Sequence, residues 1–322
     1  MKIRSAISIF ILSLFLSGHV SAKETKGIVV TVKPLHSLVS AVIGDTGEAK
    51  LLLRGNTSPH DFQLKPSQVR AMQKANVIFY IDDSFETFLH NVFENLPKHI
   101  RKFAVAQKAG LTVLAHREGK TWDEHEVHED KMEEGDGHDN HAHEEKHHDH
   151  GHHDMHVWLD PKKNAGRIIK SITRELSAIY PENRNTYKAN ARKYIKKINM
   201  LHKELKTSLA GVQDKPFIVF HDAYQYFERA YNLNGVGSIT FEPDESPSPN
   251  RIREMRAKLQ QTGAQCVFRE PQFSDRLVNT VIEGSNAKSG ILDPLGVGLK
   301  NGPELYINLL RNLAKNLKKC LE

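Results

Sequence analysis

The sequence predicts an α/β protein with largely parallel sheets, divided into two halves by one long helix. Three observations predict this class. Short apolar runs alternate with amphipathic helical patterns along most of the 322 residues, which is typical of parallel strands joined by crossover helices. One helical pattern, at 181–211, is much longer than the others. About 300 residues follow a leader segment, which is enough for two domains.

The leader occupies the first residues of the chain. Lys2 and Arg4 precede an apolar core at 6–16, and small residues end at Ala22. This order predicts a signal peptide at 1–22, because the core is too short for a permanent membrane helix. The alternative is an uncleaved N-terminal anchor. We expect an exported protein whose mature chain begins near Lys23.

The first half, 23–180, alternates the two kinds of pattern. Expected strands lie at 27–32, 49–53, 77–81 and 103–105, and expected helices at 34–43, 66–74, 85–95 and 160–179. A stretch rich in His, Asp and Glu at 116–155 interrupts the alternation. We therefore expect one α/β domain with a disordered insertion.

The helix expected at 181–211 connects the halves. Apolar residues recur at three- and four-residue intervals, which places them on one helical face. They are Tyr187, Ala191, Tyr194, Ile198, Leu201 and Leu205. A helix of about 30 residues is about 45 Å long, enough to link two domains.

The second half, 212–322, repeats the α/β plan. Expected strands lie at 217–220, 235–240, 266–268 and 290–292, and expected helices at 223–231, 248–262, 275–284 and 303–320. Cys266 and Cys320 are the two cysteines of the chain. In an exported protein such a pair favours a disulfide over a metal site or a nucleophile. The bond would fasten the last helix to the sheet.

The charge pattern argues against nucleic acid as a partner. The formal net charge is +6 at pH 7 with neutral histidines. Lys and Arg are spread along helical faces, and no basic arm or aromatic-interleaved motif accompanies them. We interpret them as a solvated surface.

The run at 125–156 consists mostly of His, Asp and Glu. These side chains supply the nitrogen and oxygen atoms that divalent metals bind. The alternative is a solvated linker that happens to be rich in histidine, since so few apolar residues cannot drive folding. A flexible segment with many weak sites would raise the local metal concentration near a stronger site.

Three histidines have settings that differ from the rest. His60 lies in a loop after an expected strand, His221 directly follows an apolar strand, and His156 ends the insertion. Ligands of open α/β sheets gather where the carboxyl ends of strands meet. Each histidine alone is more often structural, but together they predict one metal site in a cleft between the halves.

Five separated segments carry a family resemblance. They are PHDFQLKPSQV at 59–69, HVWLDP at 156–161, FHDAYQYFERAYNL at 220–233, REPQF at 269–273 and LDPLG at 292–296. Their order along the whole mature chain resembles the ZnuA-type periplasmic zinc-binding proteins of bacterial ABC importers, which carry a His-rich insertion between the first and second ligands. The resemblance implies two α/β lobes joined by a rigid helix, with metal bound between them.

The same resemblance implies a function. The protein would capture Zn²⁺ in the periplasm and deliver it to the importer's permease and its ATPase, without being an enzyme. We expect a monomer. One alternative is a periplasmic zinc storage or chaperone protein without a transporter. Another is a zinc enzyme, because three histidines with an open fourth position can activate water.

Carried over motif by motif, the resemblance implies that His60, His156 and His221 bind zinc. Zinc prefers four ligands, so a further donor is needed. Some relatives place a carboxylate just before the first histidine, where this chain has Pro59. Others use the aspartate that matches Asp293, which we expect as the fourth ligand, with water as the remaining option. Manganese-binding relatives tend to carry a carboxylate at 221, and three imidazoles favour zinc.

Asp222 stands beside the third histidine. We expect it to cap the following helix or to orient a ligand rather than to bind metal.

Overall fold

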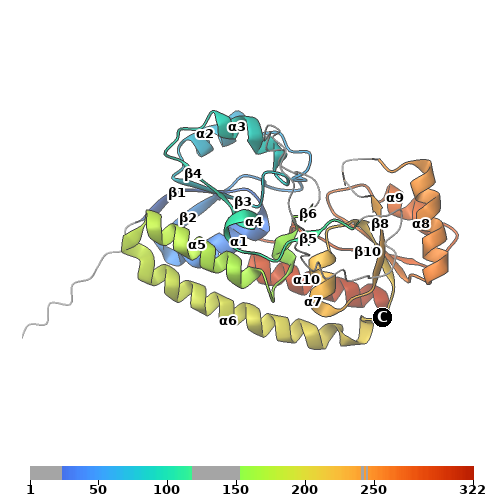
Figure 1. Cartoon of the computed structure of the whole chain (residues 1–322). Coiled ribbons are helices and arrows are strands. Elements are labelled where there is room, and N and C mark those ends of the chain that lie inside the picture. Colours follow the sequence, from blue (N-terminus) through green and yellow to red (C-terminus); the bar gives the residue numbers. More distant parts are fainter. Residues whose placement is uncertain (1–23, 118–152, 241–242, 244–245) are drawn as a thin grey trace, which may run out of the picture.

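The computed structural model describes residues 24–117, 153–240, 243 and 246–322 (Figure 1). The expected signal peptide at 1–22 and most of the His-rich insertion, 118–152, lie outside these residues. Among the described helices, none has both the length and the apolar character that a membrane crossing requires.

The N-terminal lobe contains a sheet of four parallel strands in the order β2-β1-β3-β4. These strands are β1 (Thr25–Val30), β2 (Gly47–Leu51), β3 (Val77–Tyr80) and β4 (Arg101–Ala104). Every residue of β3 is buried, because a parallel sheet has helices on both faces. The strand predictions for this half agree with the structure to within about two residues, the usual uncertainty of element ends.

Helices α1 (Lys33–Ile43), α2 (Pro66–Gln73), α4 (Val105–Lys108) and α5 (Ala165–Ile179) accompany this sheet. The prediction of one helix at 85–95 was wrong, since a 3₁₀ turn at Thr87–Leu89 precedes a short α3 (His90–Glu94). The buried carboxylate of Glu86 explains the break, because it accepts the backbone N–H groups of Ile81 and Asp82. It therefore ties this segment to the end of β3.

The C-terminal lobe has a second sheet of four parallel strands, in the order β10-β9-β7-β8. The strands are β7 (Phe217–His221), β8 (Gly235–Thr240), β9 (Cys266–Arg269) and β10 (Lys288–Ile291). Helices α7 (Gln225–Tyr231), α8 (Pro249–Thr262) and α9 (Arg276–Ile282) belong to this lobe. The predicted α/β class is thus confirmed in both halves.

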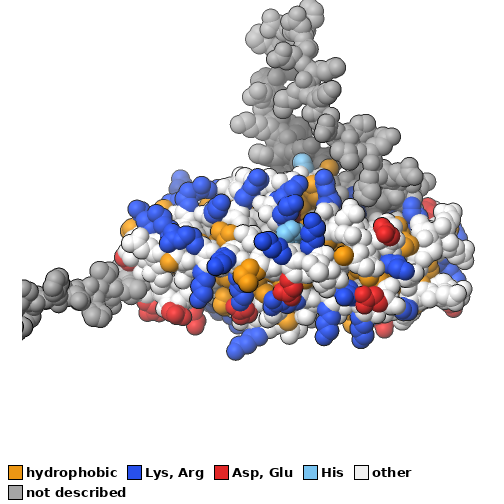
Figure 2. All heavy atoms as spheres, turned by 90° about the horizontal axis from the view of Figure 1, so that it is seen from below, with side chains coloured by type: hydrophobic (Ala, Val, Ile, Leu, Met, Phe, Trp, Pro, Cys, Tyr) orange, Lys and Arg blue, Asp and Glu red, His pale blue; other side chains and the backbone are white. Residues whose placement is uncertain are grey.

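The long helix α6 (Arg184–Leu209) runs beneath both lobes, with short 3₁₀ turns at its ends (Figure 1). Its 26 residues correspond to about 39 Å. All the apolar residues predicted for one face are buried, and α6 packs against α1, α5 and α10. Figure 2 shows the molecule from below, with Lys and Arg side chains scattered over this face as a solvated surface.

The last helix, α10 (Leu305–Leu321), joins the two lobes. It packs against α1, α6 and β10, and a disulfide between Cys266 of β9 and Cys320 of α10 confirms the predicted pairing. The Tyr306 hydroxyl donates a hydrogen bond to the Trp158 carbonyl at 2.6 Å. One continuous hydrophobic cluster consequently includes residues from both lobes, so the lobes share a core.

A short antiparallel ribbon lies between the lobes, at the base of the His-rich insertion. Strand β5 (Leu114–Ala115) pairs with β6 (His153–Asp154). We call β5, β6 and the residues 116–117 the ribbon. The predicted insertion boundaries of 116–155 were therefore too wide. The buried side chains of Arg117 and Asp154 explain the correction, because their polar partners fix both ends of the insertion in the folded body.

Candidate metal centre

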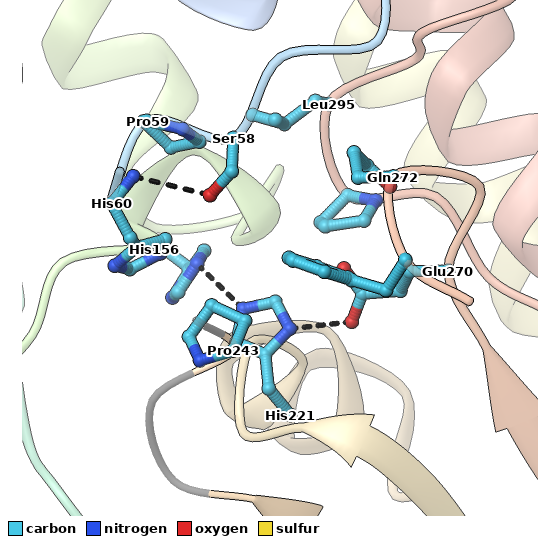
Figure 3. Close-up of a pocket in the computed structure, with 11 residues that line it drawn as sticks. Ser58, Pro59, His60, His156, His221, Pro243, Glu270, Gln272 and Leu295 are labelled. Atoms are coloured by element: carbon cyan, nitrogen blue, oxygen red, sulfur yellow. Dashed lines mark hydrogen bonds and ion pairs between the residues drawn. The ribbon is translucent and has the colours of Figure 1, made fainter. Parts of the chain in front are cut away.

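Three histidine side chains from distant parts of the sequence meet between the lobes (Figure 3). His60 comes from the loop between β2 and α2, His156 follows β6, and His221 ends β7. One donor atom from each lies within 4.8 Å of the others. The Nε2 atoms of His156 and His221 are 3.4 Å apart. Two nitrogens bound to one tetrahedral zinc ion are about 3.3 Å apart, so this pair already has the required spacing.

The ring of His221 is oriented by a buried carboxylate. Its Nδ1 lies 2.5 Å from Oε1 of Glu270, which is 1% exposed and directly follows β9. Because Nδ1–H donates to this carboxylate, the unprotonated Nε2 faces the cluster, where it could bind a metal. Burial lowers the pKa of His221, but the Glu270 charge opposes this effect and holds the pKa above its ordinary value.

A second buried carboxylate holds His156. Asp154 Oδ1 lies 2.8 Å from Nδ1 of His156 and also accepts its backbone N–H at 2.9 Å. Burial raises the pKa of Asp154 to about 6. Burial, together with the nearby His221 and His60, holds the pKa of His156 well below its ordinary value. His156 is therefore neutral near pH 7, which is the form that binds metal.

His60 stands on a loop that contacts both lobes. Its backbone N–H donates to Ser58 Oγ at 3.2 Å, and its ring packs edge-on against Phe85 with centroids 5.1 Å apart. Asn56 in the same loop donates to the Pro271 carbonyl of the other lobe at 2.9 Å. The loop that contains His60 thus contacts the C-terminal lobe and places this histidine between the two lobes.

The cavity at the cluster is small. Its volume is about 10 Å³, room for about one water molecule or ion. Its lining combines the three histidines and Glu270 with mostly apolar neighbours (Figure 3). They are Ser58, Pro59, Pro243, Gln272, Phe273, Pro294 and Leu295. The site accommodates an ion rather than an organic molecule.

Asp293 does not join the three histidines. Its carboxylate accepts the backbone N–H groups of Leu295, Gly296 and Val297 at 3.1, 2.8 and 2.6 Å. Because all three donors belong to the turn that follows Asp293, the aspartate stabilises this turn. Its neighbours Pro294 and Leu295, but not Asp293 itself, line the cavity. The structure therefore does not support the expected fourth ligand.

Asp222 does not form the helix cap, which was one of the two roles that we expected for it. Helix α7 begins after Tyr224 and has no side-chain cap. The Asp222 carboxylate instead accepts from Nε of Arg117 at 2.9 Å. Arg117, Asp154 and Glu270 were all missed as site residues. Glu270 could have been found because it lies two residues after the strand expected at 266–268, whereas Asp154 was concealed among many acidic residues.

Comparison with known proteins identifies the family. A family model described as "Zinc-uptake complex component A periplasmic" (ZnuA) matches residues 28–320. The chain belongs to the ZnuA family. One curated relative is the "High-affinity zinc uptake system protein ZnuA" of Brucella abortus (strain 2308), which is 43% identical with 98% of each chain covered. The Yersinia pestis protein of the same name is 33% identical, over 92% of this chain and 91% of its own.

Solved structures of similar proteins share the fold. A crystal structure of ZnuA has a TM-score of 0.74 and 24% identity, covering 92% of this chain and all of its own. The zinc-bound ZnuA-like domain of Streptococcus pneumoniae AdcA has a TM-score of 0.67 and 24% identity, covering 91% and 98%. The resemblance noted from the sequence and the two-lobed fold are both confirmed. ZnuA is a periplasmic family of transport proteins.

Glu270→Gln should weaken zinc binding about ten- to hundredfold, the usual cost of losing the carboxylate behind a ligating histidine. The amide keeps the size of the side chain but removes the negative charge that increases the basicity of His221. Calorimetric zinc titration checks this expectation. Glu204→Gln is a suitable control, because Glu204 pairs with Arg311 on the surface. Equal affinities for the two variants would contradict a role for Glu270.

Proposed function

We propose that this chain captures Zn²⁺ in the periplasm and delivers it, as a monomer, to the permease of an ABC importer and its ATPase. His60, His156 and His221 are the proposed zinc ligands. The observation that carries the proposal is the cluster of three imidazoles, two buried and one half-buried, between the lobes of a ZnuA-family chain. Neutral imidazole nitrogens bind zinc better than they bind manganese, which is the harder ion.

We propose a water molecule as the fourth ligand. The carboxylate oxygens of Asp293 already accept three backbone N–H groups, and moving this side chain toward the cluster would leave those donors without their acceptor. A water ligand also leaves the ion bound by three protein groups, which favours its release to a partner.

The geometry favours a carrier over a zinc enzyme. A cavity of about 10 Å³ has no space for an organic substrate beside the ion. The buried carboxylates of Asp154 and Glu270 are hydrogen-bonded to the Nδ1 atoms of two proposed ligands, so each is engaged in orienting a histidine rather than in accepting a proton from a metal-bound water.

The central experiment separates the carrier from a storage protein. Purified protein should bind one zinc ion tightly in a calorimetric titration. Deleting the gene should impair growth in chelator-treated medium, and complementation should restore growth when the partner permease is present. Restoration without the permease would instead support storage. Absence of a tight zinc equivalent would refute zinc capture itself.

Zinc affinity should decrease as the pH is lowered. The pKa of His221 lies above its ordinary value, so protons compete for Nε2 at a higher pH than for an ordinary histidine. Below that pKa we expect affinity to fall by about tenfold per pH unit for one competing proton. Titrations between about pH 8 and about pH 5.5 cover the range in which histidine titrates. In the Glu270→Gln variant the decrease should begin at lower pH, and constant affinity across the range would contradict the mechanism.

The His-rich stretch should be an accessory to this site. Deleting 126–152, which leaves the ribbon intact, should remove additional weak zinc equivalents and preserve the tight one. Equilibrium dialysis followed by metal analysis measures both classes. Loss of the tight equivalent in the deletion variant would make the stretch the principal site.

A further inference from the structure

The guanidinium of Arg117 forms a buried double ion pair with the C-terminal lobe. Arg117 Nε donates to Asp222 Oδ2 at 2.9 Å, Nη2 also donates to Asp222, and Nη1 donates to Glu228 Oε2 at 2.6 Å. The three side chains are 13%, 7% and 6% exposed. Asp222 directly follows the proposed ligand His221, and Glu228 belongs to α7. Arg117 is the last described residue of the ribbon before the insertion.

Hydrogen bonds place the whole ribbon on α7. The Leu114 backbone N–H donates to the Tyr226 hydroxyl at 2.9 Å, and this hydroxyl donates to the Asp154 carbonyl at 2.6 Å. Tyr226 therefore bridges both strands. Although the ribbon precedes α6 in the sequence, its polar contacts attach it to the C-terminal lobe.

The position for Glu228 is built into the lobe. A Cβ atom at Gly235 would lie 2.7 Å from Glu228 Oε2, so the glycine leaves room for this carboxylate. The carboxylates of Glu228 and Asp222 accept hydrogen bonds from N–H groups on two sides of the guanidinium. Planar, forked donor geometry distinguishes arginine from lysine at such a site.

The ribbon also sets the position of one proposed ligand. Strand β6 carries Asp154, whose Oδ1 binds both Nδ1 and the backbone N–H of His156. Within the described residues, the ladder pairs Leu114 with Asp154 and Ala115 with His153. A two-stranded ribbon has little stability of its own in water. Its place on the lobe consequently depends on the side chains that anchor it.

We propose that Arg117 is a positioning residue for the metal site. By locking the ribbon to Asp222 and Glu228, it holds Asp154, and through Asp154 the ring of His156, in register with His221. This inference rests on the proposed function, because it assumes that His156 binds the ion. The residue at the base of the insertion would thus influence the affinity of the tight site indirectly, through Asp154 and His156.

The test compares Arg117→Lys and Arg117→Gln with the wild type by zinc titration. We expect each variant to bind zinc at least about tenfold more weakly, in the range found for residues that orient a ligand. The lysine variant keeps a positive charge beside the carboxylates, so it decides the question if the glutamine variant fails to fold. Arg101→Lys is the matched control, because Arg101 forms a bidentate pair with Glu175 in the other lobe; its affinity should stay within about twofold.

A double-mutant cycle distinguishes positioning from a general loss of structure. In an Asp154→Asn background, Arg117→Lys should reduce affinity by less than about threefold, because residues that act through one contact are not additive. A full additional loss in that background would overturn the proposal. So would wild-type affinity in both folded Arg117 variants.

His156→Ala, measured in the same series, separates the two proposals. If His156→Ala loses tight binding while the Arg117 variants keep it, the positioning role fails and the zinc site stands. If His156→Ala keeps tight binding, the ligand assignment fails and the positioning role fails with it.

Discussion

Replacing His221 by alanine should abolish tight zinc binding. The substitution removes a proposed ligand that a buried carboxylate holds in place. Loss of such an orienting carboxylate alone costs about ten- to hundredfold in metal affinity, so loss of the ligand should exceed about a hundredfold. His60→Ala and His156→Ala should have effects of the same kind, because each leaves only two imidazoles. Calorimetry or competition with a chromophoric chelator measures the affinity.

The matched control is His202→Ala. His202 is a partly exposed histidine on α6, whose Nδ1 lies 3.3 Å from the Tyr231 hydroxyl, and it does not belong to the cluster. Its substitution should leave zinc affinity unchanged. Circular dichroism with chelator present verifies that each variant folds. Unchanged tight binding in all three cluster variants would refute the ligand assignment.

Removing the disulfide should strongly destabilise the protein. The Cys266–Cys320 bond closes a loop with a sequence separation of 54, which corresponds to about 4 kcal/mol in the loop-entropy model. We expect the Cys266→Ala/Cys320→Ala variant to lose about this free energy of unfolding and about 8 °C in Tm, at about 2 °C per kcal/mol. Denaturant titration in the presence of a chelator removes the contribution of bound metal.

A direct chemical assay complements this comparison. Unreduced protein in denaturant should contain no titratable thiol, and reduction should release two thiols. Two thiols before reduction would show that the bond is absent in solution. If the variant unfolds at the same denaturant concentration as the wild type, α10 does not depend on its covalent link to β9.

Local sequence patterns determined most of the fold. Continuous apolar runs predicted the parallel strands, since strands covered on both faces carry apolar residues at successive positions. The 3.6-residue period predicted α6, whose buried positions are those inferred from spacing. The helix expected at 85–95 failed because the Glu86 carboxylate accepts a hydrogen bond from Thr31, which is distant in the sequence, as well as from backbone groups just after β3. Periodicity contains no information about such a partner.

The sequence by itself also determined which histidines to consider, because each of the three occupies a distinctive place beside a strand or the insertion. Only the tertiary structure showed which side chains surround these histidines and which groups hold them in place. Glu270 follows β9 and contacts His221 at the end of the neighbouring strand β7. The Asp293 carboxylate accepts backbone N–H groups of the turn that follows it, such as that of Gly296. The physical reason is that a buried polar group needs a hydrogen-bond partner inside the protein, and this partner sets its orientation and its charge. Those partners come from segments far apart in the chain, which the fold brings together.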